Sequence, residues 1–279
     1  MDEILIKAEE LWFSYDDGYT HSLKGVDVKI RKGKRIAVMG ANGSGKSTFF
    51  LCCNGILRPS RGRLLFHGEP VDYSRKGLLK LRQKVGIVFQ DPEDQLFSAS
   101  VYQEISFGLL NTGMPEPEAA EAVERIMEEM GIAEYRKRPV HALSVGQKKL
   151  VSIADVLVMR PEIAVLDEPA ASLDPKHTAL VRKLVDKMTK EGITVMISTH
   201  DVDYCLEWAD EMLLFHDGRI EASGSPEDIL GNEELLKKTH LEKPAVLKLY
   251  EAMLQKGVIS GKQPAPKNLK ALMEQILMI

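Results

Sequence analysis

Cysteine is scarce in this sequence: its 279 residues include three, Cys52, Cys53 and Cys205. Their spacing fits neither a disulfide framework nor a C-x-x-C pair, so we interpret them as packed, reduced thiols. Metal-ligand spacing is absent as well, because the histidines that might serve, such as His67 and His141, are scattered along the chain. The sequence therefore predicts no resident transition-metal site.

Long apolar runs and an excess of positive charge are also missing. No stretch approaches the ~18 consecutive apolar residues of a membrane-spanning helix. The first residues, MDEILIKAEELW, carry acids where a secretory signal would have bases. The net charge of −4 argues against a nucleic-acid protein held by a general basic field. We therefore expect a protein on the cytoplasmic side of the membrane, with no nucleic-acid partner.

What the chain does contain is an alternation of short apolar runs and helical patterns. The expected strands are residues 3–15, 22–30, 35–40, 63–68, 85–90, 163–169 and 193–200, with turn signals such as Asp17-Gly18 between the first two. A further pair, 211–216 and 219–224, flanks an Asp217-Gly218 hairpin turn. The expected helices are 46–57, 115–131, residues after about 240, and 267–278. This alternation predicts an α/β fold with a mostly parallel sheet and helices on both faces.

Two of the expected helices have an apolar face. In 115–131 that face comprises Val123, Ile126, Met127 and Met130. After residue 240 it comprises Val246, Tyr250, Met253 and Leu254. The helical stretch 110–160 interrupts the strand–helix alternation, which indicates an inserted helical subdomain.

The segment GANGSGKST at 40–48 matches the phosphate-binding pattern G-x-x-x-x-G-K-[ST] in full. It follows a predicted strand and precedes a predicted helix, so its backbone amides and the helix N-terminus can cradle phosphate oxygens. Lys46 is expected to reach the β- and γ-phosphates, and the Ser47 hydroxyl to hold magnesium. A structural glycine-rich turn is the weaker alternative.

Two adjacent acids follow the apolar run at 163–166. Asp167 is expected to hold the magnesium shell through water, and Glu168 to polarise an attacking water, which favours hydrolysis over transfer to a second substrate. A solvated acid at a strand end is the alternative for Glu168. That alternative is weaker because ligands of α/β sheets bind at this edge.

These motifs together resemble the nucleotide-binding subunits of ABC transporters over about residues 4–240. GANGSGKST is similar to Walker A, IAVLDE to Walker B, LSVGQ at 143–147 to the signature, and SLD at 172–174 to the D-loop. Gln90 matches the Q-loop, His200 the switch histidine, and Tyr15 the aromatic residue that stacks on adenine. The resemblance implies a P-loop NTPase of the ABC ATPase type at 1–240. It would have an antiparallel β subdomain, a helical subdomain at about 110–160 and a small C-terminal helical extension at 241–279.

The resemblance also implies the site. ATP would be bound by Tyr15, Gly40, Ala41, Asn42, Gly43, Ser44, Gly45, Lys46, Ser47, Thr48, Gln90, Ser144, Gly146 and Gln147. Magnesium would be held by Ser47, Gln90 and Asp167, and the catalytic residues would be Lys46, Glu168 and His200. In this family the P-loop of one subunit and the signature of another enclose each ATP. The chain is therefore expected to be a poor ATPase until it pairs head-to-tail with a second ATPase subunit, identical or paralogous.

Within the family, QDPEDQLFSASVYQEISFGLLNTG at 90–113 closely resembles ATPase subunits of energy-coupling-factor importers, especially the cobalt and nickel (CbiO) branch. THLEKPAVLKLY after residue 238 is similar to the C-terminal extension of that group. The resemblance implies a peripheral subunit on the cytoplasmic face of the cell membrane that energises cobalt or nickel import, while integral-membrane partners hold the ion. A vitamin-type importer, a soluble ABC ATPase and a P-loop kinase are the alternatives.

The segment 95–107 is expected to dock the membrane partner. Its apolar residues are Leu96, Phe97, Val101, Tyr102, Ile105 and Phe107, which we expect to be exposed. Burial in the core is a rival interpretation for Ile105 and Phe107.

Two positions depart from the family pattern: Val145 replaces a signature glycine, and Leu150 stands where a basic residue is common. A β-branched residue disfavours positive φ. Val145 therefore either has ordinary helical dihedrals at no cost, or holds the helix start back from the phosphate and makes the chain a slow signature donor. We favour a mild form of the second interpretation.

Overall fold

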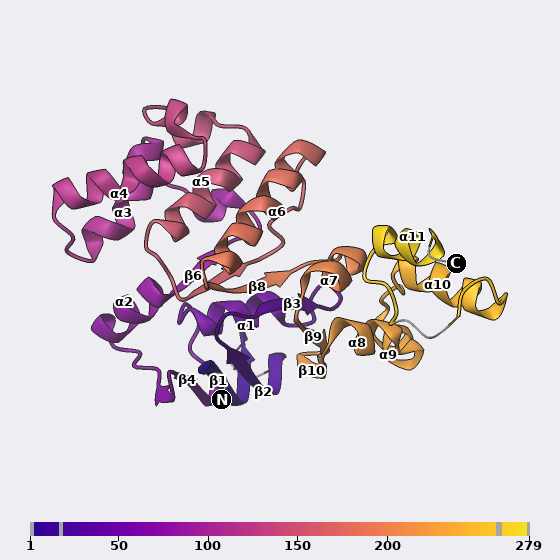
Figure 1. The fold of residues 1–279 in the computed structure, drawn as a ribbon. Helices are drawn as coiled ribbons and strands as arrows, with labels where there is room; N and C mark the ends of the chain where they lie inside the picture. The colour runs from indigo at the N-terminus through magenta and orange to yellow at the C-terminus, as the bar shows by residue number, and fades with distance from the viewer. Residues whose placement is uncertain (1–2, 17–18, 261–263, 278–279) are drawn as a thin grey trace.

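The computed structural model describes residues 3–16, 19–260 and 264–277. The expected turn at Asp17-Gly18 therefore lies outside the described residues. Two sheets form the framework of the chain (Figure 1). The first is antiparallel, with the strand order β2-β1-β4-β5. Its strands are β1 (Ile4–Ser14), β2 (His21–Arg31), β4 (Arg61–Phe66) and β5 (Glu69–Pro70).

The second sheet has six strands in the order β10-β9-β3-β8-β7-β6. They are β3 (Arg35–Met39), β6 (Val85–Val88), β7 (Ile163–Leu166), β8 (Thr194–Ser198), β9 (Glu211–His216) and β10 (Arg219–Gly224). All neighbours pair in parallel except β9 and β10, which form the expected hairpin. The predicted α/β fold with a mostly parallel sheet and an antiparallel β subdomain is confirmed.

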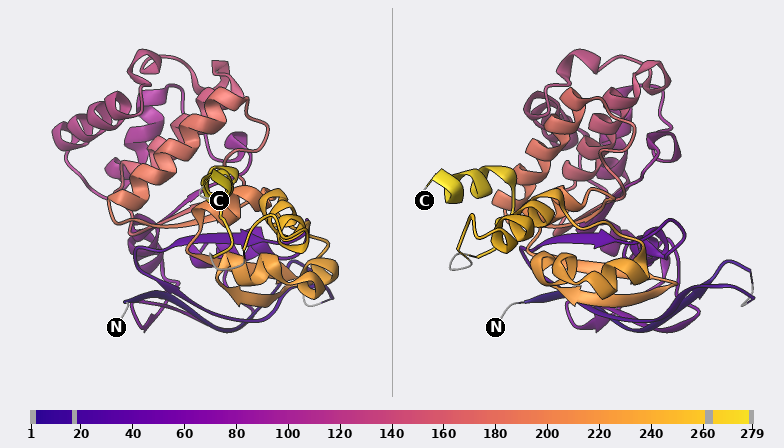
Figure 2. Two further views of the ribbon diagram at one scale, coloured as in Figure 1. Left: turned by 45° about the vertical axis from the view of Figure 1, so that its right-hand side comes forward. Right: turned by 90° about the vertical axis from the view of Figure 1, so that its right-hand side faces the viewer.

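The helices lie on both faces of the parallel sheet. They are α1 (Lys46–Cys53), α2 (Arg75–Lys84), α3 (Val101–Asn111), α4 (Glu116–Glu129), α5 (Val145–Leu157), α6 (Pro175–Lys190), α7 (Val202–Trp208), α8 (Pro226–Gly231), α9 (Glu233–Thr239), α10 (Ala245–Gln255) and α11 (Leu269–Leu277). Figure 2 shows α3 to α6 at one end of the molecule and the strands β1 and β2 at the opposite end.

Two helix boundaries differ from the sequence predictions, and five helices, α2 and α6 to α9, have no counterpart among the predicted helices. The first helix ends at Cys53 instead of 57, because Gly55 takes a left-handed φ of 72°. The helical stretch expected from about 110 begins at Val101. In α2, which the sequence predictions omit, Leu81 is the one buried residue.

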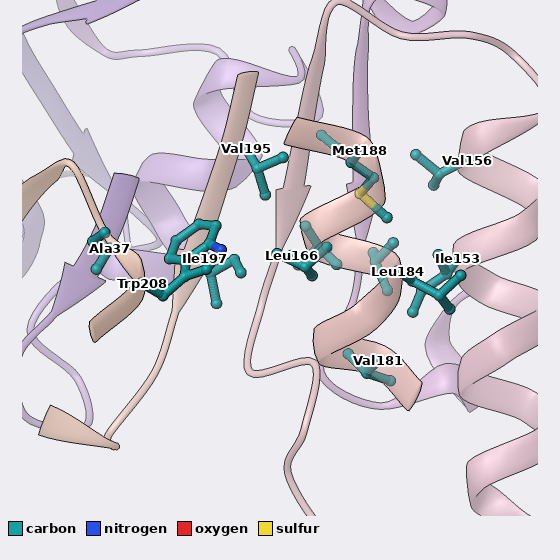
Figure 3. Close-up of a cluster of buried hydrophobic side chains, with 14 of the residues drawn as sticks. Ala37, Ile153, Val156, Leu166, Val181, Leu184, Met188, Val195, Ile197 and Trp208 are labelled. Atoms are coloured by element: carbon teal, nitrogen blue, oxygen red, sulfur yellow. The ribbon is translucent and has the colours of Figure 1, made fainter. Parts of the chain in front are cut away.

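The parallel sheet separates two hydrophobic clusters. On one face Phe49 and Phe50 of α1 pack with residues of β1 and β2. On the other face Leu184 of α6 lies among side chains of the sheet and of α5, such as Leu166 and Ile153 (Figure 3). All five of these side chains are at most 7% exposed, and full burial of one stabilises the fold by roughly 2–3 kcal/mol.

The predicted helix faces and thiols are also borne out. Val123, Met127 and Met130 of the α4 region and Val246 and Tyr250 of α10 are buried, while Ile126, Met253 and Leu254 are partly buried against the same cluster. All three cysteines are buried and free. Burial raises the pKa of the Cys52 and Cys205 thiols to about 12, which leaves them unreactive. No helix in the described part of the chain is long and apolar enough to cross a membrane.

The segment after residue 240 packs against α7. The backbone amide of Ala245 donates to Asp203 Oδ1 over 3.0 Å. Asn268 Nδ2 donates to Glu207 Oε1 over 2.9 Å. Both views of Figure 2 show α10 and α11, coloured orange to yellow, apart from α3 and α4.

Four parallel strands end at a common edge. In the pairing register Val88 lies opposite Leu166, Leu166 opposite Ile197, and Ser198 opposite Val38. The segments that follow β3, β6, β7 and β8 therefore converge, and ligands of such sheets bind at this edge.

Candidate functional site

The loop between β3 and α1 requires glycine at its two ends. Gly40 has φ 144°, and a Cβ there would lie 2.3 Å from the carbonyl oxygen of Phe215. Gly45 has φ 105°, and a Cβ there would lie 2.6 Å from the carbonyl oxygen of Ser22. Helix α1 begins directly after Gly45, and no side chain caps its first amides. The loop therefore presents uncapped backbone donors to an anion.

Two buried polar groups lie in this loop. Lys46 is 6% exposed and donates to the carbonyl oxygens of Gly40 over 2.7 Å and Ala41 over 3.0 Å. Burial lowers the pKa of Lys46, opposed by the negative charges of Glu168 and Asp167. The Ser44 hydroxyl is buried and has no hydrogen-bond partner within the described protein. Phosphate oxygens would satisfy both the ammonium and this hydroxyl.

The loop opens into a cleft that gathers most of the predicted nucleotide residues. Its lining comprises Tyr15, Ser22, Asn42, Gly43, Ser44, Gly45, Lys46, Ser47, Thr48, Gln90 and Glu168. Tyr15 is 63% exposed, and its hydroxyl lies 3.2 Å from the hydroxyl of Thr48. Its exposed ring beside the phosphate loop can stack on a flat base.

The two acids after β7 are held by a serine of β8. The Ser198 hydroxyl donates to Asp167 Oδ1 and accepts the backbone N–H of Glu168 over 2.8 Å. Asp167 is 8% exposed. Glu168 has a left-handed φ of 40°, an uncommon conformation for a non-glycine residue. That strained turn brings its carboxylate to the cleft.

The Glu168 carboxylate lies between Gln90 and His200. Gln90 Nε2 donates to Glu168 Oε2 over 3.4 Å, and His200 Nε2 lies 2.9 Å from Glu168 Oε1. Residues that follow β6, β7 and β8 thus converge on one carboxylate. A carboxylate held from both sides beside a phosphate cradle can orient an attacking water.

The oxygen donors suit a hard cation. Ser47 and Gln90 line the cleft, and Asp167 lies next to Glu168 in the chain. Among the described residues no group of three or more His, Cys, Asp or Glu side chains could hold a metal ion. Magnesium binds with few carboxylates plus substrate phosphates and water, so this donor set fits it.

The signature segment lies apart from this cleft. None of the described residues that line the cleft belongs to 143–147. Ser144 caps α5: its hydroxyl accepts the Gln147 amide over 3.3 Å, and Gln147 Oε1 accepts the Ser144 amide over 3.0 Å. Gly146 is buried, and the ring of His177 leaves no room for a side chain there, since a Cβ would lie 2.6 Å from it. The start of α5 therefore lies on a surface separate from the cleft.

The two departures from the family pattern, Val145 and Leu150, both lie on α5. Val145 is the first residue of α5, with helical conformation and a 52% exposed side chain. The backbone strain considered for Val145 is therefore absent, and the effect that remains is steric. Leu150 is buried, and its neighbour Lys149 donates to backbone carbonyls after β6.

The expected docking segment is only partly exposed. Leu96 and Val101 are buried, so their predicted exposure is wrong, whereas the rival interpretation of core burial is right for Ile105 and wrong for Phe107. Val101 and Ile105 lie one turn apart on α3, and that face of the helix is buried. Tyr102 is half-buried, with the Arg136 guanidinium 4.3 Å from its ring centroid. Phe97 and Phe107 are 67% and 46% exposed, and their rings meet edge to face at 4.9 Å. The exposed apolar surface is this aromatic pair.

Sequence reasoning missed four residues at or next to the site: Ser22, Lys149, His177 and Ser198. No local pattern indicates Lys149, because its partners are backbone carbonyls of a segment about sixty residues away in the chain. No local pattern indicates Ser198, whose contacts depend on the pairing of β7 with β8.

A family model described as ABC transporter matches residues 23–171. The energy-coupling factor transporter ATP-binding protein EcfA2 of Clostridium perfringens is 46% identical over 257 residues, which are 92% of this chain and 90% of that protein. The solved structure of cbiO1 from Clostridium perfringens, part of the ABC transporter complex cbiONQ, superposes with a TM-score of 0.74. It is 47% identical, and the match covers 90% of this chain and all of that one.

A more distant solved structure is also similar. The dimeric structure of MJ0796, a bacterial ABC transporter cassette, superposes with a TM-score of 0.72 at 25% identity and covers 80% of this chain and 99% of that one.

Proposed function

Because this chain belongs to the ABC transporter family of ATPases, as a subunit of the energy-coupling-factor type, we propose that it binds and hydrolyses MgATP to drive import of cobalt or nickel ions. The observation that carries the ATPase part is the Glu168 carboxylate, held between Gln90 and His200 beside the phosphate loop. The ion is supported by the 47% identity to cbiO1 and by the segment 90–113.

Each group of residues in the cleft has its own role in ATP hydrolysis. Lys46, Ser44 and the first amides of α1 bind the phosphates. Ser47, Gln90 and Asp167 would hold magnesium, which would neutralise phosphate charge. Glu168 orients and polarises the attacking water, and His200 holds Glu168 on one side and contacts the γ-phosphate on the other.

A second ATPase subunit completes each site. The signature residues Ser144, Gly146 and Gln147 lie outside the cleft of their own chain, so they serve the nucleotide of a partner in a head-to-tail pair. A related cassette is known as a dimer. We propose 1–240 as the ATPase domain and 241–279 as an extension that packs on α7.

Phe97 and Phe107 form the surface that docks the membrane partner, with the subunit peripheral on the cytoplasmic face. We expect Phe97→Asp to weaken co-purification with the membrane subunits by at least ~10-fold, because an exposed aromatic anchor carries much of an interface's energy. Pull-down of the assembled complex measures this effect. Leu79→Asp, at a 42% exposed leucine of α2, is the matched control. Equal retention of the two variants would contradict the docking assignment.

We propose that Val145 slows hydrolysis of the partner's ATP, because its exposed side chain lies where the partner's phosphate approaches the signature segment. We expect Val145→Gly to raise the kcat of the paired ATPase about fivefold, equivalent to ~1 kcal/mol in the transition state, with little change in KM. Val145→Ala should fall between, since it removes bulk without adding backbone freedom. Steady-state ATPase kinetics decide the matter, and a glycine variant with an equal or lower kcat would make Val145 a neutral substitution.

The transported substrate is tested by co-expressing this chain with its integral-membrane partner subunits. We expect uptake of radioactive cobalt or nickel that depends on ATP and stops with Lys46→Ala. Vitamin uptake without metal uptake would favour the vitamin-type alternative.

A further inference from the structure

Side chains of the signature helix α5 bind the segment that carries Gln90. Lys149 is fully buried, and its ammonium donates to the carbonyl oxygens of Phe89 over 2.8 Å and Gln90 over 2.7 Å. A neighbouring ion pair joins Lys148 to Glu93 in the same segment. Residues 89–93 are thus bound to the second turn of α5.

Gln95 adds a second attachment one turn further along α5. Its Nε2 donates to the carbonyl oxygen of Ser152 over 3.0 Å and to Asp155 Oδ2 over 3.1 Å. Its Oε1 accepts the backbone N–H of Phe89 over 3.3 Å. The two ends of the segment 89–95 are therefore both held by the same helix.

The attachment continues to the exposed aromatic pair. Buried Glu104 of α3 accepts the backbone N–H groups of Phe97 over 2.9 Å and Ser98 over 2.6 Å. The nucleotide cleft, the signature helix and the exposed aromatic surface are thus connected through side chains that bind backbone atoms.

We infer that Lys149 is a positioning residue that holds Gln90 in register with the start of α5, so that the two move as one body. This inference rests on the proposed ATPase function. Gln90 contacts Glu168 of its own nucleotide cleft, whereas Ser144, five residues before Lys149 on the chain, faces outward. If Gln90 and α5 move as one rigid unit, a change in the nucleotide cleft of one subunit also moves the signature residues that contact the partner's nucleotide.

The chemistry of the position favours a buried cation. Two carbonyl oxygens side by side need at least two donors from one group, which an ammonium supplies. The charges of Asp91, Asp167 and Glu168 favour the protonated amine, although burial, the larger effect, lowers the pKa of Lys149 to about 8. Removal of Lys149 would leave two carbonyls unpaired and free the segment that they anchor.

The test uses the full chain and three variants. Lys149→Met removes the donors, and Lys149→Arg keeps a cation with several donors. Lys243→Met is the matched control, because Lys243 is an enclosed ammonium, 10% exposed, that pairs with Glu251 and Glu233 far from the cleft. Hydrogen–deuterium exchange of peptides covering 89–95 reports the attachment directly, and MgATP kinetics report its consequence.

We expect Lys149→Met to speed exchange in 89–95 at least ~10-fold and to lower kcat ~10-fold, with KM for ATP changed less than ~3-fold. Lys149→Arg should recover most of both, and Lys243→Met should leave both unchanged. If Lys149→Met does not fold, Lys149→Leu, which also lacks donors, replaces it with the same expectations.

Unchanged exchange in 89–95 for the Lys149 variants would overturn the inference, as would equal effects of Lys149→Met and Lys243→Met. A wild-type chain that neither binds nor hydrolyses MgATP would instead refute the proposed function. The exchange measurement needs no nucleotide, so the two failures are distinguishable.

Discussion

Glu168→Gln is expected to lower ATP turnover by about 10³-fold while MgATP binding persists, because an amide keeps the shape of the carboxylate but cannot polarise water. The contacts with Gln90 and His200 reach both carboxylate oxygens, so a near-isosteric amide should stay in place. An ATP-bound pair of subunits should then accumulate. Size-exclusion chromatography with and without ATP measures this, and Glu162→Gln, at an acid just before β7, is the control.

A Glu168→Gln chain that elutes as a monomer with and without ATP would count against head-to-tail pairing. Turnover near the wild-type rate would remove Glu168 from the water-activating role. These two outcomes are separable, because elution reports assembly and phosphate release reports chemistry.

Lys46→Ala is expected to lower ATP turnover at least ~10²-fold, because it removes the buried ammonium that meets the phosphate charge. Unlike the glutamine variant, it should also weaken nucleotide binding, since the interaction exists in the ground state. Binding of a fluorescent ATP analogue and steady-state phosphate release together measure both effects. Lys46→Arg is the informative companion: a larger cation in a loop whose ends, Gly40 and Gly45, pack closely against backbone carbonyls should not restore activity.

Fluorescent-nucleotide binding by Lys46→Ala at wild-type affinity would contradict the phosphate assignment. A lower melting temperature alone would not explain selective loss of turnover, because Lys46 bonds only to carbonyls of its own loop among the contacts described.

Much of the site was predictable because it depends on local sequence. The phosphate loop needs glycine at positions of positive φ followed by a helix start, and both appear as a contiguous pattern. Gln90, Glu168 and His200 could be assigned from a family resemblance, and parallel strands bring them to one edge.

What the sequence did not predict depends on packing between distant segments. Phe107 and Ile105 lie two residues apart in α3, yet one is 46% exposed and the other fully buried, because the helix turns them to opposite faces. Lys149 is a surface residue by type, and only its position against the segment after β6 makes it a buried donor. Ser198 acquires its role from strand pairing alone.

Ser198 also shows how the sheet itself sets the chemistry of its edge. Its hydroxyl both donates to Asp167 and accepts from the amide of Glu168, and a serine side chain can do both at once. Side chains alternate between faces along a strand. A slip of one residue between β7 and β8 would therefore turn this hydroxyl away from the two acids and bring Ile197 or Thr199 to its place in the register. Strand alignment, usually regarded as a matter of stability, thus specifies the orientation of two neighbouring acids, and mutations that loosen β8 far from any nucleotide would act as site mutations.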